Sequence, residues 1–260
     1  MGAMKAVHTV LRRHVRDTRT YNLLRRVNTF WSLKRGGVHE TDYLGLPLIA
    51  ADSGLFIDIG ANAGQTAAGV AGLLPSHDII SFEPNPSLQD ELGWVQNQIG
   101  ARMRVEHTGL GRAEDKMVLH IPTSGDLAYE ARASLIEGEA RAHANALQTQ
   151  LGKEVTLQRR NVAIRTLDSY EFAPDLIKID VEGFESDVLL GAESTLMTHK
   201  PALIMERNSG TTVCRAWLAA RGYVFFAFDA ERSIFKADLE GALNFFAIPE
   251  ERADQVPTLD

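Results

Sequence analysis

The chain has 260 residues, of which 45% are hydrophobic and 23% are charged, and its formal net charge is −7. This length suits one large α/β domain with a sizeable core, and this composition is that of a soluble globular protein. No run approaches the ~18 apolar residues that a transmembrane helix needs, and the N-terminus lacks the apolar stretch of a signal peptide. The single cysteine, Cys214, excludes an internal disulfide and favours a reducing compartment, so we expect a cytoplasmic protein.

The charge is unevenly distributed. Residues 1–36 contain nine lysines and arginines and one acid, which leaves a net charge of −15 for the rest of the chain. Apolar residues recur in this segment at helical spacing, so we expect residues 1–50 to form an N-terminal helical arm. The basic arm either packs on the acidic body or contacts an anionic substrate, a lipid surface or a second subunit. A homodimer and a peripheral membrane contact therefore stay open.

Strands and helices are expected to alternate after the arm. Apolar runs at residues 54–60, 78–84 and 101–111 predict strands, and residues 64–74 and 86–100 predict helices between them. The rhythm breaks after residue 111. We take residues 122–160 as an insertion that shapes a substrate site.

The alternation returns at residue 175 and continues to residue 249. Alternation of this kind predicts a mostly parallel sheet with helices on both faces. We assign residues 51–250 to this domain and residues 251–260 to a C-terminal tail. Ligands of such sheets bind at the carboxyl ends of the strands, near the switch in strand order.

The ligand is indicated by the turn after the first strand. This strand ends in Asp58, and the turn holds Gly60, Asn62 and Gly64. It lacks the third glycine of a dinucleotide site and the Gly-Lys-Ser/Thr of a phosphate loop. An acid here repels phosphate but suits a cation such as a sulfonium. Glu83, at the end of the next strand, can accept hydrogen bonds from both ribose hydroxyls. Ribose and a cation without phosphate describe S-adenosylmethionine (SAM).

The segment after Glu83 is expected to hold that acid on a stiff corner. Pro84 stops the strand from running on. Asn85 can cap the next helix, with Pro86 in its first turn. Glu83 is thereby presented toward the cofactor.

Six blocks of the sequence together resemble the FkbM family of SAM-dependent methyltransferases. They occur in the family's order between about residues 52 and 248: FIDIGANAGQT, SFEPNPSLQDEL, RTLDSY, DLIKIDVEGFESDVLLGA, PALIMERN and LNFFAIP. The resemblance implies a class I methyltransferase (Rossmann-like) fold with a seven-stranded, mostly parallel sheet that ends in an antiparallel hairpin, the insertion preceding the fourth strand. It also implies O-methylation of a hydroxyl, often on a sugar or a polyketide.

The resemblance also implies which residues bind SAM. Gly109-Leu110-Gly111 falls on the loop beside the adenine, although an ordinary strand-end turn is the alternative. Ser134-Leu135 resembles a weaker family pair, to which we give no role. The implied cofactor-binding residues are Asp58, Gly60, Asn62, Gly64, Gln65, Thr66, Glu83, Pro84, Gly109, Leu110 and Asp180.

Methyl transfer needs an aligned hydroxyl and a group that removes its proton. Strand alternation puts Lys178 and Asp180 on one face, and Asp180 and Glu182 then lie at the carboxyl end of their strand. Glu206 ends the next strand. We predict these four residues as catalytic, with a structural ion pair as the alternative for Lys178. His107, near the glycine loop, and His143, in the insertion, are weaker candidates for a base, and we favour an ordinary polar role for each.

Asp180, Glu206 and Asn208 also offer hard oxygen ligands of the kind that Mg²⁺ prefers. We therefore keep a magnesium site as a prediction. Its alternative is that Glu206 acts directly as an acid or a base, or accepts a hydrogen bond from a substrate hydroxyl.

The sequence thus predicts a SAM-dependent O-methyltransferase. Its expected acceptor is a hydroxyl of a sugar or of a glycan-like small molecule or oligosaccharide. The alternatives are methylation of a polyketide or lipid hydroxyl, or of a nitrogen, and a non-catalytic SAM-binding assembly protein. A nucleic-acid acceptor is not expected, because the body is acidic and lacks an N-P-P-Y-like segment.

Overall fold

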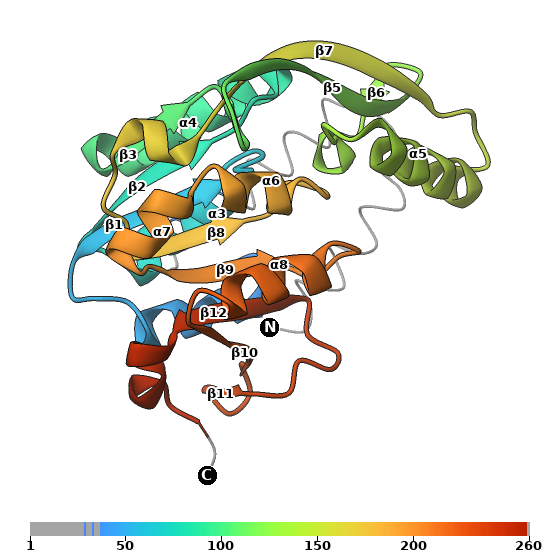
Figure 1. Ribbon diagram of the computed structural model, residues 1–260. Coiled ribbons are helices and arrows are strands. Elements are labelled where there is room, and N and C mark those ends of the chain that lie inside the picture. Colours follow the sequence, from blue (N-terminus) through green and yellow to red (C-terminus); the bar gives the residue numbers. More distant parts are fainter. Residues whose placement is uncertain (1–28, 30–32, 34–36, 259–260) are drawn as a thin grey trace.

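The computed structural model describes residues 29, 33 and 37–258 (Figure 1). The predicted arm of residues 1–36 lies outside the described residues, apart from Thr29 and Leu33, which are helical. The first described element is a 3-10 helix, η1 (Thr41–Leu48), whose Tyr43 and Leu46 are buried in the main core. The last part of the segment assigned to the arm therefore packs into the domain.

The main sheet has eight strands in the order β11-β10-β12-β9-β8-β1-β2-β3. The five strands from β9 to β3 pair in parallel, and β12 pairs antiparallel with both β9 and β10. The predicted parallel sheet with an antiparallel end is confirmed, and short β11 adds one strand to the expected seven. The strands are β1 (Gly54–Ile59), β2 (His77–Phe82), β3 (Met103–Glu106), β8 (Leu176–Ile179), β9 (Ala202–Glu206), β10 (Tyr223–Asp229), β11 (Ile234–Lys236) and β12 (Asn244–Pro249).

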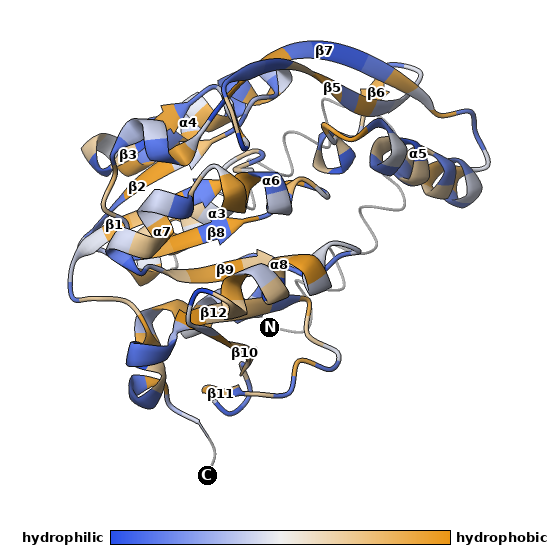
Figure 2. Ribbon diagram, in the orientation of Figure 1, coloured by the Kyte–Doolittle hydropathy of each residue, from blue (hydrophilic) through white to orange (hydrophobic). Residues whose placement is uncertain are grey.

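Helices cover both faces of this sheet (Figure 1), and its strands are largely hydrophobic (Figure 2), as expected for a sheet that is buried on both faces. Phe56 points to a core shared with η1, α3 and α4, whereas Ile57 and Ile59 point to a core shared with α6, α7 and α8. The helices are α3 (Gln65–Leu73), α4 (Gln89–Ile99), α6 (Glu185–Leu190), α7 (Glu193–His199) and α8 (Thr211–Ala219), with short 3-10 helices η2 (Pro86–Leu88), η3 (Gly100–Arg102), η5 (Leu167–Tyr170) and η6 (Glu250–Gln255).

A second, four-stranded sheet in the order β4-β7-β5-β6 stands beyond the main sheet (Figure 1). It has a small core of its own, and α5 packs on its long strands. This sheet and its helices extend from residue 109 to residue 165, and the expected insertion of residues 122–160 lies within that range. Its elements are β4 (Gly109–Leu110), β5 (Asp115–Ser124), β6 (Leu127–Ala128), η4 (Glu130–Arg132), α5 (Glu137–Leu151) and β7 (Thr156–Arg165).

No helix in the described part of the chain is long and apolar enough to cross a membrane.

Candidate functional site

The turn after β1 is shaped by three residues with a left-handed backbone. Gly60, Asn62 and Gly64 have φ angles of 79°, 51° and 81°. A Cβ atom on Gly60 would overlap the carbonyl oxygen of Asp180, so only glycine fits where the turn passes the end of β8. Gly64 is the N-cap of α3 and provides no side-chain cap for the first N–H groups of that helix. These groups are available to an oxygen of a ligand.

Glu83 ties this turn to the turn after β2. Its Oε2 accepts a hydrogen bond from the backbone N–H of Asn62 at 2.8 Å, and its Oε1 accepts one from that of Asn85 at 2.9 Å. Burial raises the pKa of Glu83 to about 7, although both N–H groups favour the ionised form. Each carboxylate oxygen keeps a second lone pair, which a ribose hydroxyl can use.

The corner after Glu83 forms as the sequence indicates. The side chain of Asn85 accepts a hydrogen bond from the N–H of Ser87 at 3.1 Å, and Pro86 opens the first turn. A Cβ atom on Gly109 would lie 3.5 Å from the side chain of Pro84. The start of β4 therefore lies beside the Glu83 corner. Leu110 is buried in the core that the main sheet shares with α6, α7 and α8.

Lys178 connects the ends of β1 and β8 from within the sheet. Its Nζ donates to the carbonyl oxygen of Gly60 at 2.7 Å and lies 3.2 Å from Oδ1 of Asp58 and 3.6 Å from Oδ2 of Asp180. Burial alone would lower the pKa of Lys178, but Asp58 and Asp180 outweigh it and raise the pKa above its ordinary value. The ammonium group therefore stays charged at neutral pH, which favours a structural ion pair over a base.

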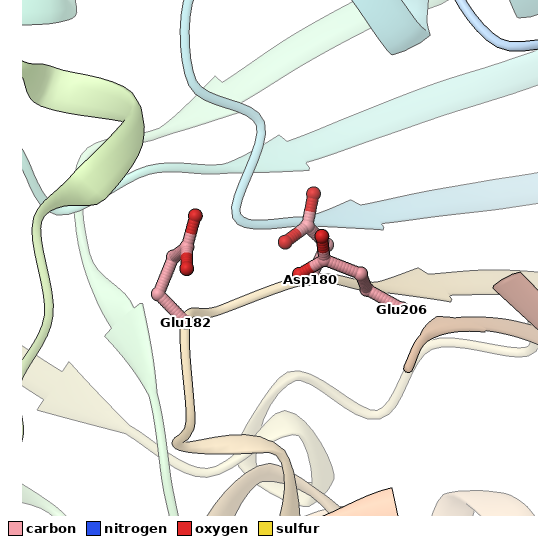
Figure 3. Close-up of side chains that lie close together, drawn as sticks. All are labelled: Asp180, Glu182 and Glu206. Carbon is pink, nitrogen blue, oxygen red and sulfur yellow. The ribbon is translucent and has the colours of Figure 1, made fainter. Parts of the chain in front are cut away.

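Three carboxylates gather just beyond the ends of β8 and β9. One oxygen from each of Asp180, Glu182 and Glu206 lies within 4.8 Å of the other two. Figure 3 shows Asp180 and Glu206 side by side, with Glu182 on the loop that follows β8. We call these three residues the acid trio. Two of its members come from adjacent parallel strands, so their proximity follows from the sheet.

Two members of the acid trio, Glu182 and Glu206, hold protons more tightly than ordinary glutamates. Burial raises the pKa of Glu206 to about 8, with the neighbouring charges of Asp180 and Glu182 and a hydrogen bond to Asp180 adding to the effect. Burial and the charge of Asp180 likewise raise the pKa of Glu182 to about 7. Like charges this close disfavour full ionisation, so the trio binds a proton near neutral pH and attracts any cation placed beside it.

Asn208, predicted as a third metal ligand, follows β9 and begins the turn into α8. Its Oδ1 accepts a hydrogen bond from the N–H of Gly210 at 2.9 Å. That oxygen therefore already stabilises the turn, and Glu182 supplies the third oxygen beside Asp180 and Glu206.

The comparison with known protein families adds a direct observation to this geometry. A family model described as the Methyltransferase FkbM domain matches residues 58–225, from the acid at the end of β1 to a residue within β10. The chain belongs to the FkbM methyltransferase family. The resemblance inferred from the sequence blocks is confirmed, and with it the class I methyltransferase fold of a SAM-dependent enzyme family.

One curated relative of this FkbM chain is the 2-O-methyltransferase NoeI of Sinorhizobium fredii (strain NBRC 101917 / NGR234), which is 26% identical over 150 residues. The match covers 55% of this chain and 58% of NoeI. A solved FkbM methyltransferase from Methylobacillus flagellatus KT has a TM-score of 0.49 and 17% identity, over 87% of this chain and 60% of that one.

Tyr43 is a residue of this FkbM site that the sequence did not indicate. Its side chain is buried, and its hydroxyl lies 3.5 Å from Oγ1 of Thr66 in the first turn of α3. Burial raises its pKa, while the charge of Lys178 acts in the opposite direction. The tyrosine reaches the first turn of α3 from η1, and no sequence motif spans the 23 residues between Tyr43 and Thr66.

Proposed function

We propose that this FkbM methyltransferase transfers the methyl group of SAM to a hydroxyl of a sugar or glycan-like acceptor. The observation that carries the proposal is the acid trio. Its member Asp180 lies beside the predicted SAM-binding turn of residues 60–64, since Lys178 contacts Asp180, Asp58 and the carbonyl group of Gly60. The name of the partial relative NoeI, a 2-O-methyltransferase, supports oxygen as the atom that is methylated.

SAM is proposed to bind across the turns after β1 and β2. Glu83 is the proposed ribose acid, and Asp58 and Asp180 place negative charge near the cationic part of the cofactor. The first turn of α3, with Gln65 and Thr66, is proposed to receive the carboxylate of SAM. Gly109 and Leu110 are proposed to lie beside the adenine.

The acid trio is proposed to align the acceptor and remove its proton. The acceptor oxygen attacks the methyl carbon of SAM, the carbon–sulfur bond breaks, and S-adenosylhomocysteine leaves with the sulfur electron pair. The hydroxyl proton passes to a carboxylate, for which Glu206 is the candidate because its raised pKa makes it a better base than an ordinary glutamate. Asp180 and Glu182 hold the acceptor hydroxyls in position.

Replacing Glu83 with alanine should weaken SAM binding by roughly 1–3 kcal/mol, because charged hydrogen bonds to the ribose are lost. Calorimetry measures the affinity. Asp78→Ala is the matched control, since Asp78 is an exposed acid at the other end of β2. Unchanged affinity in Glu83→Ala would show that Glu83 does not hold the ribose.

The rate should depend on pH through the raised pKa values of Glu182 and Glu206. A carboxyl with a pKa of about 8 is protonated at pH 6 and ionised at pH 9, and only the ionised form accepts a proton. The kcat/KM for the acceptor should therefore rise with pH across this range, and Glu206→Gln should flatten the rise. A rate that is flat or falls with pH would contradict a carboxylate base.

The same raised pKa values predict how stability depends on pH. In the folded protein Glu182 and Glu206 keep their protons to higher pH than in the unfolded chain, where the pKa of glutamate is 4.5. Thermal stability should therefore fall as the pH rises from about 5 to about 8.

A magnesium-dependent form of the same reaction stays a second candidate. The three carboxylates supply hard oxygen ligands, and a divalent cation would offset both the burial and the mutual repulsion that raise the pKa values of Glu182 and Glu206. Such an ion would lower the pKa of the acceptor hydroxyl. Sensitivity of turnover to a chelator separates the two forms.

Incubation with methyl-labelled SAM and a panel of oligosaccharides, polyketide glycosides and lipids tests the acceptor class. We expect label on a carbohydrate. Label only on a lipid or polyketide would correct the acceptor, and SAM binding without transfer to any member would favour a non-catalytic assembly protein.

A further inference from the structure

The acid trio depends on an unusual backbone conformation at Glu182. Asp180 and Glu206 end adjacent strands, but Glu182 lies in a loop and has a φ angle of 51°, in the left-handed region. Glutamate rarely adopts this conformation unless its surroundings impose it. Groups on two sides of the loop hold it so that the Glu182 carboxylate lies beside those of Asp180 and Glu206.

One support comes from the helix side of the loop. Glu185, at the start of α6, is buried, and its Oε1 accepts hydrogen bonds from the N–H groups of Val181 at 3.3 Å and Gly183 at 3.2 Å. These two groups flank Glu182. Their shared acceptor curls the loop around one carboxylate oxygen.

The other support comes from the second sheet. The hydroxyl of Ser134 donates to the backbone carbonyl oxygen of Glu182 at 2.7 Å and accepts from the N–H of Ile136 at 3.0 Å. A hydroxyl has one proton, so Ser134 has no second hydrogen bond to donate once it bonds the Glu182 carbonyl oxygen. Ser134 is 1% exposed, and its own N–H and carbonyl group pair with those of His120 in β5. The serine is thus fixed on both of its backbone groups.

Two further contacts bring α5 against the same loop. His143 lies with Nε2 3.6 Å from Oε2 of Glu182, while its Nδ1 lies 3.2 Å from the carbonyl oxygen of Arg132. A Cβ atom on Gly183 would lie 3.0 Å from Cγ of Glu139. The second sheet and its helix therefore meet the main domain at the loop that carries Glu182.

We propose that Ser134 is a positioning residue for methyl transfer: its hydrogen bond to the Glu182 carbonyl group holds the Glu182 carboxylate in the acid trio. The proposal rests on the proposed function of the trio. It makes the second sheet part of the catalytic centre, in addition to any contact that the sheet has with the acceptor. Ser134 itself contacts neither SAM nor the acceptor in this account.

The test combines Ser134→Ala with Glu182→Gln in a double-mutant cycle, measured with the most rapidly methylated oligosaccharide of the panel. A misplaced carboxylate typically costs about 10- to 100-fold in rate, so Ser134→Ala should lower kcat by that amount and leave the KM for SAM unchanged. In the Glu182→Gln background the same change should cost less than about twofold, because the group that it positions is already altered. Ser124→Ala, at the far end of β5, is the control.

Hydrogen exchange of residues 181–184 provides a readout that needs no acceptor. Ser134→Ala should speed exchange in this loop and leave the turn at residues 60–64 unchanged. Unchanged exchange in the loop would overturn the proposal, as would equal rate losses from Ser134→Ala in the two backgrounds. Full activity of Glu182→Gln alone would instead contradict the role of Glu182 in the proposed function, and the exchange result would still decide whether Ser134 holds the loop.

Discussion

Replacing Lys178 with methionine should lower the free energy of unfolding by about 3–5 kcal/mol, because it leaves the carboxylate of Asp58 buried without its charge partner. Asp58 is 0% exposed, and the carbonyl group of Gly60 loses its donor in the same change. For a domain of this size the melting temperature should fall by roughly 10 °C. The raised pKa of Lys178 keeps its ammonium group charged through the neutral range, so the loss should appear at any pH between about 6 and 9.

Denaturant unfolding measures this effect, with Lys236→Met as the control. Lys236 is also paired with an aspartate, but its side chain is 44% exposed, and exposed pairs typically contribute about 0–1 kcal/mol. The double variant Asp58→Asn/Lys178→Met should be less destabilised than the sum of the single variants, since it removes both charges together. Equal stability of Lys178→Met and the unmodified protein would show that the buried pair does not hold the two strand ends together.

Replacing Glu206 with glutamine or Asp180 with asparagine should lower the rate of methyl transfer by about 10²–10⁴-fold. Glutamine and asparagine keep the size of the side chain but cannot accept the hydroxyl proton. SAM binding by Glu206→Gln should change little, because Glu206 is proposed to face the acceptor. Glu240→Gln, on the exposed surface, serves as the control.

A chelator resolves how these carboxylates act. If turnover is insensitive to EDTA, the carboxylates work without a metal. If turnover vanishes with EDTA and returns with Mg²⁺, they hold an ion. Full activity in both Asp180→Asn and Glu206→Gln would remove the acid trio from the mechanism altogether.

The main sheet was predictable because the chain signals it locally. Four of the five parallel strands, β1, β2, β8 and β9, are short apolar runs with an acid at or next to their carboxyl ends, and each of these four is followed by a helix. The positions of Asp58, Glu83, Asp180 and Glu206 follow from that pattern, since parallel strands end at one edge of the sheet. Lys178 and Asp180 share a face because side chains alternate along a strand, and in the structure the Lys178 ammonium group lies between Asp180 and Asp58 of β1.

The parts that the sequence did not indicate depend on contacts between distant segments. Tyr43 reaches Thr66 from η1, and Ser134 reaches Glu182 across 48 residues of sequence. Neither residue stands in an amphipathic pattern that would point to its partner. The second sheet was also only partly visible, because its long strands bury few side chains in a small core and its first strand has two residues.

Methyl transfer from SAM to an oxygen of a carbohydrate is tested most directly with ¹³C-methyl SAM. The purified protein is incubated with the labelled cofactor and the oligosaccharide panel, and the product is examined by carbon NMR. We predict a methoxy signal on a sugar that disappears in Glu206→Gln, while that variant still binds SAM. A methyl signal on nitrogen, or a product formed equally well by Glu206→Gln, would contradict the account.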